Sequence, residues 1–232
     1  MARINELPPP PDNPIRSPEV SVRGEERVEL RGPAGKLDAR AFGPEDATHA
    51  VVICHPHPLY GGTMHSPVPL SIARALAERP RAAFVRFNFR GVPASEGKHD
   101  HGVGEMDDVA AAIALLRSRA PRASVCVCGH SFGSWVALKA AARDGGVDRV
   151  ALIGPSIRFF QFSPNDGAAF PGRLAIFIGD EDEFCDPDEA RTLATALGAE
   201  LRLFPGFDHH FMKSRRTLAE AVVPFLAPES SM

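Results

Sequence analysis

The chain has few cysteines, no long apolar run and no strong charge excess, and each shortage excludes a class of protein. Four cysteines in 232 residues are too few and too irregularly spaced for a disulfide framework. No apolar run approaches the roughly 20 residues that a membrane-spanning helix needs, and the start MARINELPPPP lacks the apolar region of a secretory signal. A net charge of -3 gives no electrostatic footprint for nucleic acid. We therefore expect a cytoplasmic protein that binds neither nucleic acid nor membrane.

The length and the distribution of proline predict a simple domain organisation. A chain of 232 residues suffices for one large α/β domain with a buried core. The first nineteen residues hold six prolines, which favour an extended arm and exclude a helix. We expect a proline-rich arm over residues 1–19 and a single domain over residues 20–232. The arm could lie loosely on the surface, bind a partner, or cover a neighbouring subunit in a homodimer.

Short apolar runs alternate with Ala/Leu-rich stretches of helical spacing. The runs cover residues 27–30, 37–42, 50–54, 83–89, 124–128, 149–153, 174–178 and 200–204. The helical stretches cover residues 69–78, 105–118, 132–143, 188–196 and 214–226. Strands that are apolar on both faces and alternate with helices indicate an α/β fold with a mostly parallel sheet flanked by helices. The first two runs predict an antiparallel hairpin at one edge, and about twenty residues between 153 and 174 leave no room for a cap domain.

A nucleophile candidate lies where the run at 124–128 meets the helical stretch at 132–143. The residues between them read Gly129-His130-Ser131-Phe132-Gly133, which is a G-x-S-x-G pattern in a strand-to-helix context. Such a turn lifts a serine hydroxyl above the sheet and points the amides of a helix N-terminus at it. Ser131 is therefore the expected nucleophile.

A nucleophilic serine needs a base and an orienting acid, which in this architecture follow it along the chain. Acids at 180–183 follow one predicted strand, with Asp186 close behind, and His209 and His210 follow the next. All of them lie after strands, at the edge of the sheet where ligands bind. The spacing alone leaves open which acid and which of the two histidines would act.

Longer motifs give the chain a resemblance to a known family. They are HPHPLYGGTM at 55–64, FNFRG at 87–91 with SEG at 95–97, GHSFG at 129–133, GDEDE at 179–183 and PGFDH at 205–209. The chain resembles the α/β hydrolases, in particular compact bacterial members without a cap that are related to dienelactone hydrolases and small carboxylesterases. The resemblance implies Ser131 as nucleophile, Asp182 as acid and His209 as base. Because dienelactone hydrolases proper use a cysteine where this chain has Ser131, their lactone chemistry is not implied.

The oxyanion of such an enzyme is held by two backbone amides. One belongs to the residue after the nucleophile, Phe132, and the other to the loop after the run at 50–54. Proline has no N–H, so Pro56 and Pro58 are excluded in that loop. His57 is the expected donor, with Leu59 and Tyr60 as the alternatives.

These residues predict a serine hydrolase that acts on small to medium acyl esters through an acyl-enzyme. Tyr60, Phe184 and Phe207 are the expected substrate contacts, and no cofactor or metal is expected. Two H-x-H pairs, at His55/His57 and at His99/His101, raise the alternative of a zinc site. A thioesterase or amidase would use the same three residues, and a non-catalytic binding protein can share the fold.

Overall fold

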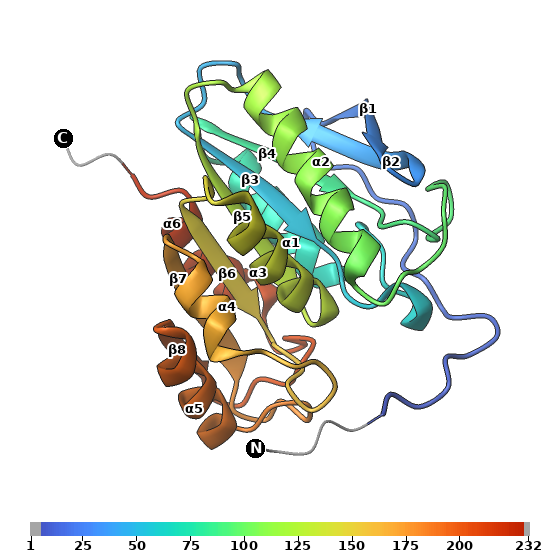
Figure 1. The fold of residues 1–232 in the computed structure, drawn as a ribbon. Helices are drawn as coiled ribbons and strands as arrows, with labels where there is room; N and C mark the ends of the chain where they lie inside the picture. Colours follow the sequence, from blue (N-terminus) through green and yellow to red (C-terminus); the bar gives the residue numbers. More distant parts are fainter. Residues whose placement is uncertain (1–5, 230–232) are drawn as a thin grey trace.

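Eight strands form one sheet in the computed structural model, which describes residues 6–229 (Figure 1). They are β1 (Glu26–Gly32), β2 (Gly35–Phe42), β3 (His49–Cys54), β4 (Ala82–Phe87), β5 (Ser124–His130), β6 (Arg149–Ile153), β7 (Arg173–Gly179) and β8 (Glu200–Phe204). Their order across the sheet is β1-β2-β4-β3-β5-β6-β7-β8. The pairs β1·β2 and β2·β4 are antiparallel, and every other neighbouring pair is parallel. The predicted fold class, with its antiparallel hairpin at the edge, is confirmed.

The helices cover both faces of the sheet. They are α1 (Pro67–Ala77), α2 (Val103–Arg119), α3 (Phe132–Asp144), α4 (Pro164–Ala169), α5 (Pro187–Leu197) and α6 (Arg215–Leu226). Helices α1 and α6 share one hydrophobic cluster with one face, while α2, α3 and α5 share a second cluster with the other (Figure 1). The central strands are buried throughout: all of β4 and all but the first residue of β3. Burial on both faces requires apolar residues without alternation, which explains the continuous runs in the sequence.

One α-helix and one short 3-10 helix, Pro58–Tyr60, are absent from the sequence prediction. Helix α4 is six residues long and buries no side chain, so it has no apolar periodicity to detect. It begins after Ser163, whose side chain accepts a hydrogen bond from the backbone of Asn165. This helix and its flanking loops are all that lies between β6 and β7, so there is no cap domain.

The remaining features concern the arm, the thiols and the helix lengths. The described part of the proline-rich arm lies against its own domain and reaches the loop after β3. All four cysteines are free and buried. Within residues 6–229, no helix has the length and apolarity to cross a membrane.

Candidate active site

Ser131 occupies a strained turn between β5 and α3. Its backbone has φ 58° and ψ -121°, in a region that non-glycine residues rarely adopt. The turn is held by its amide, which donates to the carbonyl of Ile153 at 2.9 Å. The Ser134 hydroxyl in turn donates to the Ser131 carbonyl at 2.6 Å. The backbone of Ser131 is thereby fixed at the carboxyl edge of the sheet.

The two glycines of the motif allow this turn because other backbone segments pass directly over them. A β-carbon on Gly133 would lie 2.5 Å from the His55 carbonyl oxygen and 2.7 Å from that of Cys54. One on Gly129 would collide with the carbonyl of Gly133 itself. A side chain at Gly133 would push the turn away from β3, and one at Gly129 would push the start of α3 away from β5.

His209 and Asp182 form a buried pair beside this turn. The ring Nδ1 of His209 lies 2.8 Å from Oδ2 of Asp182, and the two residues are 2% and 5% exposed. The second carboxylate oxygen accepts a hydrogen bond from the amide of Phe184 at 2.8 Å. With both oxygens of Asp182 engaged, the His209 ring has a fixed orientation and its Nδ1 carries the proton.

The other candidates from the sequence have different partners. Asp186 caps α5 by accepting from the amides of Asp188 and Glu189, and Asp180 accepts from the amide of Gly206 at 2.6 Å. His210 lines the cavity described below and lies on the exposed side of the loop. Partial burial lowers the pKa of His210, and the electrostatic effect of the adjacent His209 lowers it further.

Two residues that the sequence analysis does not single out pack against the His209–Asp182 pair. Gly154 follows β6, and a β-carbon there would lie 3.1 Å from Nδ1 of His209. His130 donates from Nε2 to the carbonyl of His209 at 3.0 Å, and burial lowers the pKa of His130 well below its usual value. Neutral His130 therefore fixes the backbone of His209 through this hydrogen bond. The lack of a side chain at Gly154 leaves space for the ring of His209.

Ser156 is a third residue without an assignment from the sequence. Its hydroxyl lies 3.0 Å from the hydroxyl of Ser131, and the residue is 2% exposed. Among the hydrogen bonds of residues 6–229, this is the one that the Ser131 hydroxyl makes. Its position directly after a central strand, at the edge where ligands bind, is the signal that could have marked it.

The backbone amides that are candidates to bind the oxyanion differ in whether they already donate a hydrogen bond within the protein. Leu59 donates to Nδ1 of His57 at 3.2 Å, and Tyr60 donates to the carbonyl of His57 at 3.1 Å. Neither the amide of His57 nor that of Phe132 donates to any acceptor within residues 6–229. Their side chains are in contact, with ring centroids 4.7 Å apart. Of the three alternatives in this loop, His57 alone retains a free N–H.

A cavity of about 480 Å³ opens above Ser131. Of the three expected substrate contacts, Tyr60 and Phe184 line it. Phe207 does not line this cavity: it is buried in the core, between Phe204 and Phe211. The expectation of a substrate contact at Phe207 is therefore corrected, because the turn after β8 directs its ring into the core.

The histidine pairs do not form a metal centre. Both ring nitrogens of His55 are engaged, Nδ1 with the carbonyl of Pro56 at 2.6 Å and Nε2 with the amide of Phe89 at 3.0 Å. His99 pairs with Glu105 at 2.7 Å. No group of three or more His, Cys, Asp or Glu side chains within residues 6–229 is arranged to hold a metal ion.

A strained serine turn on a mostly parallel sheet, with a buried His–Asp pair beside it, is the arrangement of an α/β hydrolase. The model of the family described as "alpha/beta hydrolase fold" matches residues 50–205. The chain belongs to this family. The resemblance inferred from the sequence motifs is thereby confirmed.

Bacterial relatives share the fold over most of the chain. An α/β serine hydrolase without lid from Xanthomonas campestris is 31% identical with a TM-score of 0.77, covering 89% of this chain and 95% of its own. A protein of unknown function from Agrobacterium tumefaciens is 29% identical with a TM-score of 0.79, covering 87% and 94%. An uncharacterized protein from Rickettsia prowazekii is 30% identical over 212 residues, 86% of this chain and 88% of the relative.

Proposed function

We propose that the protein is a serine hydrolase that cleaves small to medium acyl esters, with Ser131 as nucleophile, His209 as general base and Asp182 as the orienting acid. The observation that carries the proposal is the buried 2.8 Å contact between His209 and Asp182 next to a serine at φ 58°. A binding protein has no need for strain of this kind. The similarity to a serine hydrolase from Xanthomonas campestris supports the same chemistry.

Acylation begins when the Ser131 hydroxyl turns from Ser156 toward Nε2 of His209 and attacks the ester carbonyl. His209 takes the hydroxyl proton and becomes an imidazolium, which the Asp182 carboxylate stabilises through Nδ1. The imidazolium then donates its proton to the departing alkoxide. The products of this half-reaction are the free alcohol and an ester of Ser131 with the acyl group.

The free amides of His57 and Phe132 stabilise the negative oxygen of the tetrahedral intermediate. The amide of Phe132 belongs to the first residue of α3, so the helix dipole adds to its effect. In deacylation, His209 removes a proton from water, and the resulting attack releases the carboxylic acid and restores Ser131.

The cavity supports the proposed size class of the substrate. Its volume of about 480 Å³ lies in the lower half of the roughly 300–1,000 Å³ typical of small-molecule sites. Phe159, Phe160 and Phe184 contribute aromatic surface to its wall. We infer that an acyl chain of a few carbons, or a small aromatic acid, fits this space.

Hydrolysis of a p-nitrophenyl ester series from acetate to dodecanoate, by wild type and Ser131→Ala, tests the proposal. We expect a maximum at short or medium chains, and a loss in kcat on the order of 10⁴–10⁶ in the variant. A fluorophosphonate probe should label Ser131 in the wild type alone. A wild type that neither hydrolyses any ester nor takes up the probe would instead indicate a binding protein.

A further inference from the structure

The proline-rich arm, dark blue in Figure 1, precedes β1 in the chain. Two of its residues, Leu7 and Pro8, line the cavity. Along its described length most side chains are exposed, but Leu7, Pro14, Arg16 and Ser17 are half-buried. Ile15, between two of these, is 96% exposed. The arm therefore contacts the domain at spaced positions, as an extended strap does, and leaves the residues between them in solvent.

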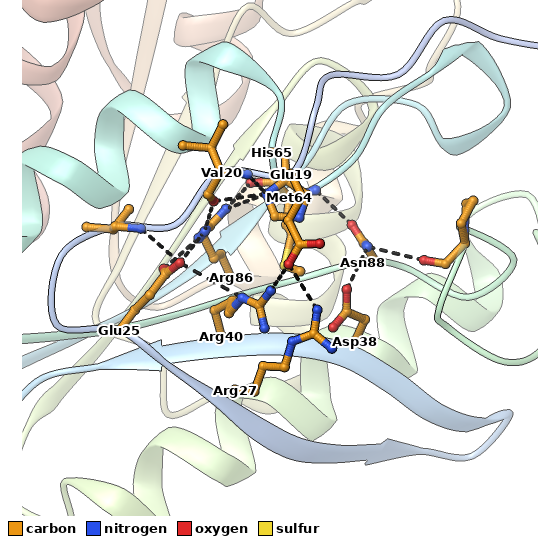
Figure 2. A network of polar contacts seen from close by, with 12 residues as sticks. Glu19, Val20, Glu25, Arg27, Asp38, Arg40, Met64, His65, Arg86 and Asn88 are labelled. Atoms are coloured by element: carbon orange, nitrogen blue, oxygen red, sulfur yellow. Dashed lines mark hydrogen bonds and ion pairs between the residues drawn. The ribbon is translucent and has the colours of Figure 1, made fainter.

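Arg86 anchors the segment that directly follows the arm to the core of the domain (Figure 2). Arg86 lies on the central strand β4 and is fully buried. Its guanidinium donates to the carbonyl of Val20 at 2.6 Å and to that of Met64 at 2.8 Å, and it forms an ion pair with Glu25. Removal of the Glu25 carboxylate would leave the buried charge of Arg86 unpaired. The chain just after the arm is thus fixed to the segment that leads into α1.

Ile15 and Arg16 of the arm contact the loop that carries the His57 amide. The Arg16 guanidinium donates to the carbonyls of Pro58 and Gly62, both at 3.2 Å. The carbonyl of Ile15 approaches Gly61 so closely that a side chain at that glycine would collide with it. The absence of a side chain at Gly61 is therefore a requirement of the seated arm.

The outer end of the arm reaches the cavity itself. The hydroxyl of Tyr60 donates to the carbonyl of Pro8. Leu7 and Pro8 line the same cavity as Ser131, and Phe159 and Phe160 line it too. The run of prolines that follows restricts the free arm to extended conformations, so little conformational entropy is lost when it is seated.

We propose that the arm is a fixed wall of the substrate cavity and that Leu7 limits the size of the ester that can bind. This inference rests on the proposed function, because it concerns the selectivity of that site. A smaller side chain at position 7 enlarges the cavity, and a larger one narrows it. The fold has no cap domain, and the arm supplies part of the enclosure that a cap would give.

The test compares full-length Leu7→Ala and Leu7→Trp with wild type, using Ile15→Ala as the matched control from the same arm. Two ester series are measured, one with a varied acyl chain and one of acetates with a varied alcohol. We expect Leu7→Ala to raise the kcat/KM ratio of the bulkiest to the smallest ester by about tenfold in one series. Leu7→Trp should lower the ratio in the same series, and Ile15→Ala should match wild type. Ratios that stay at the wild-type value in both series for both Leu7 variants would overturn the proposal.

Trypsin cleavage after Arg16 reports the seating of the arm without any esterase activity. We expect cleavage in the folded protein to be at least about tenfold slower than in a synthetic peptide of residues 10–22, because the clasped side chain has to leave its carbonyls first. Equal cleavage rates in the folded protein and in the peptide would overturn the proposal that the arm is a fixed wall of the cavity. Slow cleavage would show that the arm lies on the domain, whether or not the protein hydrolyses esters. If cleavage is slow and no ester is hydrolysed, the proposed function is wrong, and the role of Leu7 in ester selectivity is wrong with it.

Discussion

The hydroxyl of Ser131 makes its hydrogen bond with the hydroxyl of Ser156, 3.0 Å away, and not with the ring of His209. When Ser131 is the donor of this bond, the nucleophile has to break it before it can pass its proton to the base. A neutral hydrogen bond of this kind is worth about 1 kcal/mol. Breaking this contact therefore adds at most about the same amount to the activation free energy of the reaction.

Ser156→Ala removes this competing contact. We expect the rate of Ser131 labelling by a fluorophosphonate to rise by up to about fivefold, the equivalent of about 1 kcal/mol. Labelling followed by mass spectrometry measures it. A tenfold fall would show instead that Ser156 supports the reactive conformation of Ser131.

His209→Ala and His210→Ala are adjacent substitutions with different expected results. Only His209 contacts Asp182, so its loss should lower kcat on the order of 10⁴-fold or more. His210→Ala should keep activity within about tenfold, since its ring lines the cavity without a contact to the acid. Equal losses in steady-state kinetics would contradict the assignment.

Asp182→Asn and Asp186→Ala separate the two acids by function and by stability. Asp182→Asn should lower kcat on the order of 10⁴-fold, because an amide does not hold the required tautomer of His209. Asp186→Ala should leave kcat unchanged and lower the free energy of unfolding by about 1 kcal/mol, because it removes the cap of α5. Ester kinetics and urea unfolding on both variants check this, and a large kcat loss in Asp186→Ala would reverse the roles.

Gly154→Ala should displace the base. The new methyl carbon would lie 3.1 Å from Nδ1 and 3.2 Å from Cε1 of His209, so the ring has to shift by a few tenths of an ångström. We expect kcat to fall by about ten- to a hundredfold, because catalytic geometry is sensitive to small displacements. Gly145→Ala is the matched control: Gly145 also has a positive φ, 70°, and nothing lies within 4 Å of its added β-carbon. It should cost stability alone, and an equal kcat loss there would show that backbone strain, not contact with His209, is the cause.

His55 should make stability depend on pH. Burial lowers its pKa from 6.5 to about 3, so the unfolded chain binds a proton between these values and the folded chain does not. The free energy of unfolding should therefore fall as pH drops below about 6.5, with a slope of up to about 1.4 kcal/mol per pH unit from this residue. Urea unfolding at several pH values measures the slope.

His55→Gln can still accept from the amide of Phe89 and does not titrate, so the slope should decrease in this variant. Substitution of the exposed His101 by Asn serves as the control and should leave the slope unchanged. An undiminished slope in His55→Gln would assign the effect to other groups.

The sequence predicts the sheet well because its central strands are buried on both faces and stand out as apolar runs. Helix α4 has no such signal, since it buries no side chain. The strained turn at Ser131 can be predicted because Gly133 is required for the close approach of β3 and Gly129 for that of the start of α3. Burial, in contrast, cannot be read from a loop: Phe184 and Phe207 look equivalent in the sequence, yet one lines the cavity and the other lies in the core.

Neither the choice of Asp182 as the acid nor the position of the arm could be predicted from the local sequence, for another reason. Four acids at 180–183 and Asp186 occupy one loop and the following cap, and only the position of a histidine 27 residues after Asp182 distinguishes them. The arm has no periodicity at all, because its contacts use backbone carbonyls on both sides. Every residue has a backbone carbonyl, so acceptors of this kind leave no residue pattern.

The seat of the arm has a practical consequence for anyone who produces this protein. A tag fused on the amino side of the arm lies close in sequence to Leu7, which lines the cavity. On the carboxyl side of the described residues, Glu229 pairs with Arg79, beside the residues that precede β3 and β4. Purification handles and immobilisation linkers belong on the carboxyl end, where they leave the entrance clear.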